Sequence, residues 1–306
     1  FLAWYLDQIG LSVMLYGRKN SVRWQNLQAT RSNGLVVLPE TIGITNCLEE
    51  AVQFSEIIVI SVGAQSLRTL LSEFPTFCLE KKTIVLCMKG IETITGKRLT
   101  QVAQEFLPPS ASVAIWVGPG HVQDFTAGIP NCMVIDSEED QIKEKLIGLF
   151  SSNLIRFYYG HDLIGNEIGA ASKNVIGIAA GMLDGLRKTS LKGALMSRGT
   201  REIARLIHAM GGKETSAYGL AHLGDYEATV FSRYSHNREF GERFVRGEPY
   251  QELAEGAATT SALLLLGKRY HTELPICTAV NAVIHLGEDP NRVLSDLFLR
   301  SLKAEF

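Results

Sequence analysis

The sequence predicts an α/β fold, with a doubly wound parallel sheet in its first half and an all-α domain in its second half. Two observations predict it. Short runs rich in Val and Ile alternate with helical patterns up to about residue 158, which is typical of a mostly parallel sheet. From about Asp162 onward the apolar residues follow helical periods. We therefore expect two domains, residues 1–158 and residues 159–306.

The composition is that of a soluble globular protein. The 306 residues are 46% hydrophobic and 20% charged, and the formal net charge is -2, so nothing predicts a nucleic acid or an anionic membrane as partner. The five cysteines are scattered and never in a C-x-x-C spacing, which argues against a disulfide framework and a zinc site. Without a signal peptide pattern or a run of roughly 18 apolar residues, we expect a cytoplasmic protein that binds no metal.

The elements of the first half follow in order. The opening residues FLAWYLDQIG predict a helix. Runs rich in β-branched residues predict five strands, at residues 11–17, 56–62, 82–88, 112–118 and 131–137. Apolar periods predict four helices between them, at residues 47–55, 66–74, 99–107 and 141–150. Because ligands bind at the carboxyl ends of parallel strands, we expect functional residues just after these strands.

The start of the chain departs from the usual order of a Rossmann-like dinucleotide-binding domain, which is strand, glycine-rich loop and helix. Here a helix leads directly to the second strand, LSVMLYG, so we expect the first strand and the glycine-rich loop to lie upstream of Phe1. After the second strand stand Arg18 and Lys19. Basic residues there favour NADP, whereas an acidic residue would favour NAD. Two solvated loop residues are the alternative.

The second half begins with the segment GAASKNVIGIAAGMLDGL, residues 169–186. Further helices are predicted at residues 200–212, 252–270 and 288–302. Lys173 lies among small and apolar residues, and an ammonium group is costly to bury without a partner. Helical spacing places Gly177 and Asp184 on its stripe, so a ligand or another backbone can approach there. A lysine whose stem reaches a domain edge is the alternative.

Three further stretches carry candidate residues. Asp225 in GLAHLGDYEAT is either an N-cap or the carboxylate that pairs with a buried Lys173. The polar stretch SHNREFG, residues 235–241, suits a phosphate, with a solvated loop as the alternative. Lys89 follows a predicted strand, where it either faces a ligand or caps the strand.

Seven motifs follow one another along the chain: MKGIE, VGPG, GNEIGAASKNVIGIAAGMLDGL, SRGTREIARL, GLAHLGDYEAT, SHNREFG and AEGAAT. In order and spacing this set resembles the bacterial type of NAD(P)-dependent glycerol-3-phosphate dehydrogenases, over essentially the whole chain. The resemblance implies reversible hydride transfer between NAD(P)H and dihydroxyacetone phosphate, which gives sn-glycerol 3-phosphate for phospholipid synthesis. Because basic residues follow the second strand, we expect a slight preference for NADP over NAD. We also expect a homodimer, which fits this architecture.

The resemblance also implies roles for individual residues. Lys173 is the general acid/base, and Asp225 holds it in place. A partly desolvated lysine has its pKa moved toward neutrality, where proton transfer is most effective. The expected substrate contacts are Lys89, Gly118, Gly120, Asn174, Thr229, Ser235, His236, Asn237 and Arg238. The expected cofactor contacts are Arg18, Lys19, Lys89, Val122, His236 and Glu255.

Several positions depart from the family pattern, among them Ser190, which stands near where an asparagine is expected in a segment one residue shorter than usual. His236 stands where an arginine is expected to contact the substrate phosphate, and imidazole lacks the permanent charge and planar fork of guanidinium. Gly120 removes a serine hydroxyl from the Gly-Pro-Ser turn, and Gly63 replaces a proline. Two alternatives therefore stay open: a reductase of another small keto or hydroxy substrate, and a nucleotide-binding homologue with weak activity.

Overall fold

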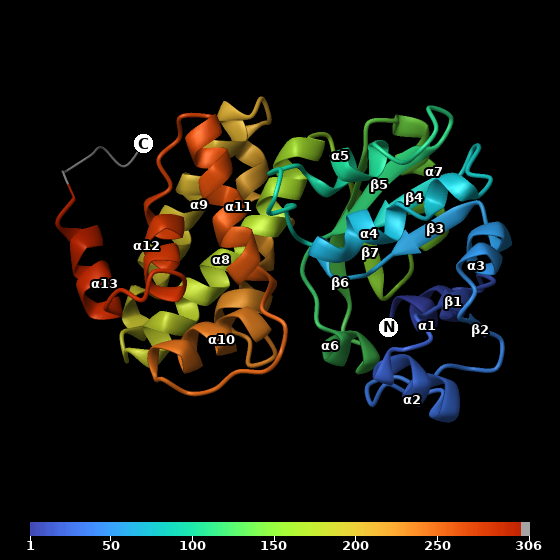
Figure 1. The fold of residues 1–306 in the computed structure, drawn as a ribbon, viewed down its shortest axis with the longest axis horizontal. Helices are drawn as coiled ribbons and strands as arrows, with labels where there is room; N and C mark the ends of the chain where they lie inside the picture. The colour runs from blue at the N-terminus through green and yellow to red at the C-terminus, as the bar shows by residue number, and fades with distance from the viewer. Residues whose placement is uncertain (301–306) are drawn as a thin grey trace.

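The computed structural model describes residues 1–300 and shows a sheet part and a helical part side by side (Figure 1). In Figure 1 the strands stand on the right and helices α8 to α13 on the left. The last strand, β7 (Ile155–Tyr159), is followed closely by α8 (Leu163–Gly185). The change from strands to helices therefore falls between residues 159 and 163.

The sheet part contains two sheets. β1 (Met14–Tyr16) and β2 (Gly43–Thr45) form a parallel pair. The larger sheet has the strand order β3-β4-β5-β6-β7, and all its neighbouring strands are parallel except β5 and β6. Its other strands are β3 (Ile57–Ile60), β4 (Thr83–Leu86), β5 (Ser112–Val117) and β6 (Asn131–Ser137). The prediction of a mostly parallel sheet is confirmed.

Helices cover both faces of the larger sheet, because its central strands are apolar on both sides. Ile84 and Leu86 share a core with α4 (Leu67–Leu71) and α5 (Leu99–Gln104). Val85, between them, shares another core with α1 (Leu2–Gln8) and α7 (Asp140–Phe150). Since successive side chains of a strand point to opposite faces, this is the doubly wound arrangement that the sequence predicts. The remaining helices of this part are α2 (Val22–Thr30), α3 (Leu48–Phe54) and α6 (Val122–Thr126).

The helical part is built around α8, in which every residue from Gly165 to Leu183 is buried. Val175 and Ile176 of α8 share a core with Ile203 and Leu263 from two other helices. The other helices of this part are α9 (Lys192–Ala209), α10 (His236–Val245), α11 (Glu255–Arg269), α12 (Pro275–Ile284) and α13 (Pro290–Phe298). The all-α prediction is confirmed. Within residues 1–300 no helix combines the length and the apolar character that a membrane span needs.

Polar side chains tie the first turns of α8 to the sheet part. Asn166 Nδ2 donates to Asp136 Oδ2 at 2.7 Å. The buried Glu167 carboxylate accepts hydrogen bonds from the Arg98 guanidinium and from the N–H and hydroxyl groups of Thr100. These bonds fix the start of α8 relative to the sheet.

The strands differ from the prediction in three ways. β2 and β7 are absent from it, the strands predicted at 11–17, 56–62 and 82–88 are shorter, and β6 runs antiparallel to β5. β7 lies at the edge of the sheet, where Ile155 and Phe157 are buried while Arg156 and Tyr158 are exposed. Such alternation lacks the continuous apolar run by which the central strands are recognised.

Four helices are also absent from the prediction: α2, α6, α10 and α12. Only Trp24 of α2 is buried, so the sequence of this helix shows almost no apolar periodicity that could predict it. The polar stretch 235–241 is helical rather than a loop, because Ser235 caps α10 by accepting a hydrogen bond from the N–H of Arg238. α12 begins with Pro275, which is favourable in a first turn and easily taken for a loop residue.

Candidate active site

Lys173, Lys89 and Asp225 meet between the two parts of the molecule. Lys173 projects from α8, Lys89 follows β4, and Asp225 ends the short 3-10 helix η5 (Leu223–Asp225). One carboxylate oxygen, Asp225 Oδ2, lies 2.6 Å from Lys89 Nζ and 2.9 Å from Lys173 Nζ. Lys173 is therefore a buried, paired lysine rather than one that reaches a domain edge.

Three other residues join these groups by hydrogen bonds. Lys173 Nζ donates to Thr229 Oγ1 at 2.8 Å, and Lys89 Nζ donates to the Gly118 carbonyl at 2.6 Å. Asn174 Nδ2 donates to the Lys89 carbonyl at 3.2 Å. We call the joined set the lysine cluster: Lys89, Gly118, Lys173, Asn174, Asp225 and Thr229.

The lysine cluster is not neutral. It holds two ammonium groups against one carboxylate, a formal charge of +1. Burial lowers the pKa of Lys173 to about 8; the Asp225 carboxylate opposes this shift and the Lys89 ammonium adds to it. Asp225 Oδ1 is buried and has no hydrogen-bond partner among residues 1–300. Such atoms are rare in folded proteins, so this oxygen marks a place for a ligand hydroxyl or a water.

The chain after Asp225 forms a π-helix, η6 (Glu227–Phe231), and π turns are frequent at functional sites. Thr229 Oγ1 donates to the Asp225 carbonyl at 2.7 Å, which orients this hydroxyl toward Lys173. The Ala228 carbonyl oxygen lies 2.9 Å from His121 Nε2. Because His121 belongs to the sheet part, this hydrogen bond joins the two parts beside the lysine cluster.

The turn from Gly118 to Gly120 follows β5 and requires both glycines. Their φ angles are +136° and +143°, a region that L side chains rarely adopt. A Cβ at Gly118 would lie 2.9 Å from Met133 Cα, and one at Gly120 would lie 2.4 Å from the Phe125 ring. A serine at position 120 would therefore be strained here. Val122 follows as the first residue of α6.

The start of α10 carries three of the predicted residues. Ser235 Oγ accepts from the Arg238 N–H at 3.3 Å. Asn237 Oδ1 accepts from the Gly256 N–H at 2.9 Å, which links α10 to α11. His236 is exposed, and its Nδ1 lies 3.1 Å from the Tyr250 hydroxyl.

Arg238 is not joined to the lysine cluster. Its guanidinium donates to Asp184 Oδ2 at 2.7 Å, to Glu242 Oε2 at 2.8 Å and to the Ser232 carbonyl at 3.1 Å. These partners lie on α8, on α10 and in the preceding turn. The observed contacts of Arg238 therefore hold α10 in place.

The predicted cofactor residues lie at several strand ends. Glu255 opens α11, and its Oε1 accepts from the Ala64 N–H at 3.0 Å, just after β3. Burial raises the pKa of Glu255. Arg18 and Lys19 are exposed after β1, and within residues 1–300 neither makes a hydrogen bond to the lysine cluster.

The small residues of α8 beyond Lys173 lie against neighbouring segments of the chain. A Cβ at Gly181 would lie 1.8 Å from the Arg238 carbonyl oxygen, and one at Gly177 would lie 2.7 Å from Thr229 Cγ2. α8 therefore packs closely against α10 and η6. This packing brings the start of α10 beside the turn of α8 that carries Lys173.

Sequence reasoning missed a buried pair, His222 and Tyr226, on either side of Asp225. Both residues are 0% exposed. His222 Nε2 lies 2.8 Å from the Tyr226 hydroxyl, and its Nδ1 lies 2.8 Å from the Gly169 carbonyl oxygen. The available signal is the spacing of a histidine and a tyrosine four residues apart, which places them one turn apart.

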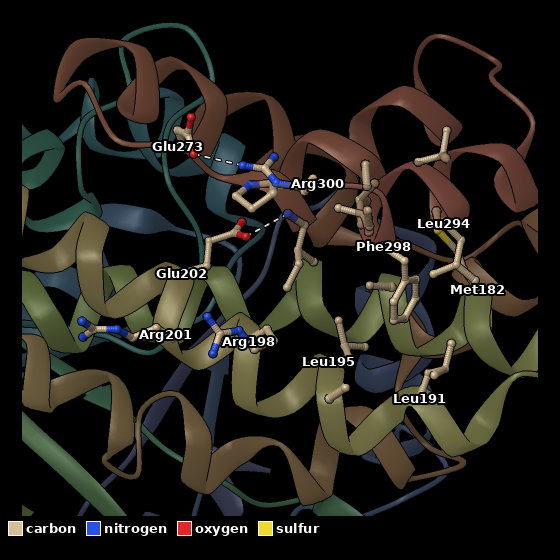
Figure 2. A pocket seen from close by; sticks show the side chains of 18 of the residues that line it. Met182, Leu191, Leu195, Arg198, Arg201, Glu202, Glu273, Leu294, Phe298 and Arg300 are labelled. Atoms are coloured by element: carbon tan, nitrogen blue, oxygen red, sulfur yellow. Dashed lines mark hydrogen bonds and ion pairs between the residues drawn. The ribbon is translucent and has the colours of Figure 1, made fainter. Parts of the chain in front are cut away.

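A cavity of about 930 Å³ lies elsewhere, among α8, α9, α12 and α13 (Figure 2). Figure 2 shows Leu195 and Phe298 on its apolar side and Arg198 and Arg201 near its polar side. No residue of the lysine cluster lines this cavity. Its buried carboxylate, Glu202, accepts from two N–H groups at the start of α12, whereas Asp225 Oδ1 has no hydrogen-bond partner within residues 1–300. The lysine cluster is therefore the candidate active site.

The lysine cluster can give and take a proton at neutral pH. An ammonium group whose pKa is near 8 is populated in both protonation states there. The excess positive charge can also stabilise an oxygen that becomes negative during a reaction. In the described part of the chain, no three His, Cys, Asp or Glu side chains are grouped so as to hold a metal ion.

Comparison with protein families gives two matches that together span most of the chain. The model described as NAD-dependent glycerol-3-phosphate dehydrogenase N-terminus matches residues 1–143. The model of the C-terminus of the same family matches residues 162–295.

Individual proteins give the same result. The chain is 35% identical to a glycerol-3-phosphate dehydrogenase [NAD(P)+] of Chlorobium phaeobacteroides, over 96% of this chain and 95% of that protein. It is 32% identical to the protein of that name from Fusobacterium nucleatum, over 99% and 90% of the two chains. A crystal structure of glycerol-3-phosphate dehydrogenase from Coxiella burnetii superposes with a TM-score of 0.91 at 26% identity, covering 98% of this chain and 95% of the other.

Proposed function

This chain belongs to the NAD-dependent glycerol-3-phosphate dehydrogenase family, and we propose that Lys173 exchanges the proton in its reaction. The enzyme reversibly reduces dihydroxyacetone phosphate to sn-glycerol 3-phosphate with NAD(P)H. When bound, the nicotinamide cofactor supplies the hydride that forms the new C–H bond. The carbonyl oxygen must gain a proton in the same reaction, and a residue of this chain must donate it.

The observation that carries the proposal is the shared carboxylate of Asp225, which lies within 2.9 Å of Lys173 Nζ and 2.6 Å of Lys89 Nζ. In reduction, protonated Lys173 donates N–H to the oxygen and becomes a neutral amine. In oxidation, the neutral amine takes the proton from the substrate hydroxyl. A pKa of about 8 suits both directions.

The other members of the lysine cluster support this exchange. Asp225 keeps the Lys173 ammonium in place, and Thr229 fixes its direction through a 2.8 Å hydrogen bond. Lys89 contributes the second positive charge, which stabilises the oxygen as it becomes negative. Asn174 and the Gly118–Gly120 turn line the same region and are the substrate contacts that we propose beside them.

We assign the substrate phosphate to the start of α10, where backbone N–H groups and the helix dipole favour an anion. Asn237 uses its oxygen on Gly256, which leaves its side-chain nitrogen for the phosphate. Ser235 and His236 lie in the same turn. The contact predicted for Arg238 stays a prediction, because its guanidinium would have to leave Asp184 or Glu242 to reach a phosphate.

The cofactor side is proposed at the strand ends. The family binds NAD(P), and residues that fit it follow β1, β3, β4 and β5, where ligands bind in open parallel sheets. Arg18 and Lys19 are exposed and basic after β1, which supports a preference for the 2′-phosphate of NADP. Lys89, Val122, His236 and Glu255 are the further cofactor contacts that we propose.

Three coarser features complete the proposal. We place a domain boundary at residues 158–159, one residue before the end of β7 at Tyr159 and shortly before α8 begins at Leu163. A reducing, cytoplasmic location is supported by five free cysteine thiols. A homodimer is supported by exposed Leu286, Phe298 and Leu299 near α13, and light scattering in solution tests it.

The first test is the oxidation of NADPH or NADH with dihydroxyacetone phosphate as substrate. We expect turnover with both cofactors and a higher kcat/KM with NADPH. Lys173→Met should abolish turnover while cofactor binding, measured by fluorescence, is kept. A folded Lys173→Met variant with full turnover would overturn the assigned role of this lysine.

The second test concerns the phosphate. Unphosphorylated dihydroxyacetone should be a poor substrate because it lacks the group that the start of α10 binds. His236→Arg restores a permanent charge at this turn, so KM for dihydroxyacetone phosphate should fall. An unchanged KM would place the phosphate away from His236.

A further inference from the structure

We infer that His222 is a positioning residue, which holds the turn that carries Asp225 at a fixed distance from the turn of α8 that carries Lys173. The inference rests on the proposed role of Lys173 and adds a residue that does not touch the substrate. It begins from the contacts of His222, which is 0% exposed and lies three residues before Asp225.

The protonation of the imidazole follows from its two partners. The Gly169 carbonyl can only accept, so Nδ1, 2.8 Å away, must carry a hydrogen. Burial lowers the pKa of His222 to about 4, so the ring is neutral at physiological pH. Its Nε2 is then an acceptor, and the Tyr226 hydroxyl, 2.8 Å away, donates to it.

These two bonds connect the two turns of the lysine cluster. In an α-helix the carbonyl of residue 169 also accepts the N–H of residue 173. His222 is therefore bound to the carbonyl at the base of the Lys173 turn. On its own side, the His222 carbonyl accepts from the Asp225 N–H at 3.0 Å, so its main chain and its side chain together bridge Asp225 to α8.

Two further contacts restrict the movement of His222 and Tyr226. A Cβ at Gly169 would lie 3.0 Å from His222 Cβ, so a larger residue there would push His222 outward by a few tenths of an ångström. Tyr226 is 0% exposed and its hydroxyl lies within 3.5 Å of Thr200 Oγ1 on α9. The His222–Tyr226 pair is therefore enclosed by α8, α9 and η5, and Asp225 moves only if this pair moves.

The position of Asp225 sets the behaviour of Lys173. Its carboxylate raises the pKa of Lys173, against burial and the Lys89 charge. If the bridge is lost and Asp225 moves away, the pKa of Lys173 must fall. Reduction needs protonated Lys173, so its rate would be lost at a lower pH than in the wild-type enzyme.

The test is the pH dependence of kcat for reduction, with binding of NADPH as a folding control. His222→Ala should lower kcat by about 10- to 100-fold, the loss expected for a misplaced catalytic group. It should also move the pH of half-maximal turnover down by about 0.5 or more. His222→Asn keeps a donor near Gly169 and should recover part of both losses.

Tyr226→Phe covers the case in which His222→Ala fails to fold. It removes one hydroxyl, leaves the ring, and should give a smaller shift in the same direction. Gly169→Ala should act likewise, because its methyl group pushes His222 outward. His285→Ala is the matched control: His285 Nε2 lies 3.0 Å from the Ala257 carbonyl, far along the chain from Asp225, and its loss should leave the pH profile unchanged.

A purely structural role predicts a different result. In that case folded His222→Ala and Tyr226→Phe would melt earlier yet keep the wild-type kcat and pH profile, which would overturn the inference. Failure of the proposed function is distinguishable, because Lys173→Met would then keep its turnover whatever His222 does.

Discussion

Lys173 and Lys192 lie in different regions of the helical part and are equally buried, each 8% exposed. Lys192 Nζ lies 2.7 Å from Asp184 Oδ2, donates to the Val230 carbonyl and lies over the Phe231 ring. Asp184 Oδ2 also accepts from Arg238, and Arg238 and Arg246 both pair with Glu242. Around Lys173 two lysines share the single carboxylate of Asp225, whose other oxygen is buried and has no hydrogen-bond partner among residues 1–300.

The two sites therefore differ in something other than burial. Both ammonium groups are removed from water, and each shares a carboxylate oxygen with a second cation, but only the carboxylate beside Lys173 has a buried oxygen without a hydrogen-bond partner among residues 1–300. The network around Lys192 joins α8, α9 and α10 and so stabilises the fold at that position. The network around Lys173 keeps hydrogen-bonding capacity, which in our proposal is used by the substrate.

The largest expected effect separates these two lysines. Lys173→Met should lower kcat by about 10²- to 10⁴-fold, the usual contribution of a general acid. Lys192→Met should keep kcat and lower the free energy of unfolding by about 1–3 kcal/mol, because Asp184 and the Val230 carbonyl lose a donor. Steady-state kinetics and denaturant unfolding measure the two effects. A folded Lys192→Met variant without turnover would contradict the distinction.

The next effect concerns the two charged side chains beside Lys173, Lys89 and Asp225. The Lys89 ammonium lowers the pKa of Lys173, so Lys89→Met should raise that pKa and move the loss of reduction activity to a pH above about 8. Asp225→Asn removes the group that raises the pKa and should move it downward. The pH profiles of kcat for reduction test both signs, and profiles that coincide would show that neither charge acts on Lys173.

A smaller effect is expected where α8 packs against α10. In Gly181→Ala the new Cβ would meet the Arg238 carbonyl oxygen at 1.8 Å, so the helices must separate. We expect a loss of about 1–3 kcal/mol in the free energy of unfolding and a higher KM for the substrate. Gly193→Ala is the control, because no atom lies within 4 Å of its new Cβ; equal losses in both variants would exclude the steric cause.

The smallest effect should come from the exposed basic residues after β1. Arg18→Ala or Lys19→Ala should each lower the ratio of kcat/KM for NADPH to that for NADH by about two- to fivefold, the range of exposed charge pairs. Arg292→Ala, an exposed arginine of α13 that pairs with Glu288, is the control. An unchanged ratio in the first two variants would remove the basis for an NADP preference.

The sequence predicts the fold well where apolar patterns are strong. The strands β3, β4 and β5 and the buried helix α8 follow continuous apolar runs, and each is confirmed. The elements it misses are those with weak patterns: α2 buries one residue, β7 lies at an edge, and α10 starts with polar residues. Their structure depends on neighbours that are distant along the chain.

The candidate site shows the same limit. Lys173 and Asp225 attract attention from sequence because charged residues in apolar surroundings need partners. That Lys89 shares the same carboxylate cannot be read from spacing, since Lys89 and Asp225 are 136 residues apart. The role of His222 cannot be predicted from the sequence, because its partners are the Gly169 carbonyl on α8 and the Tyr226 hydroxyl. Both hydrogen bonds depend on how closely the segment of His222 packs against α8 at Gly169.

The hydrogen bonds of Lys89 also bear on how this protein can evolve. Lys89 comes from the sheet part, whereas Asp225 and Lys173 come from the helical part. A chimaera that inherited residues 1–158 from a relative with an uncharged residue at position 89 would have a lysine cluster of lower net charge. The two parts are therefore expected to be inherited together, even though most residues of each hydrophobic core come from one part.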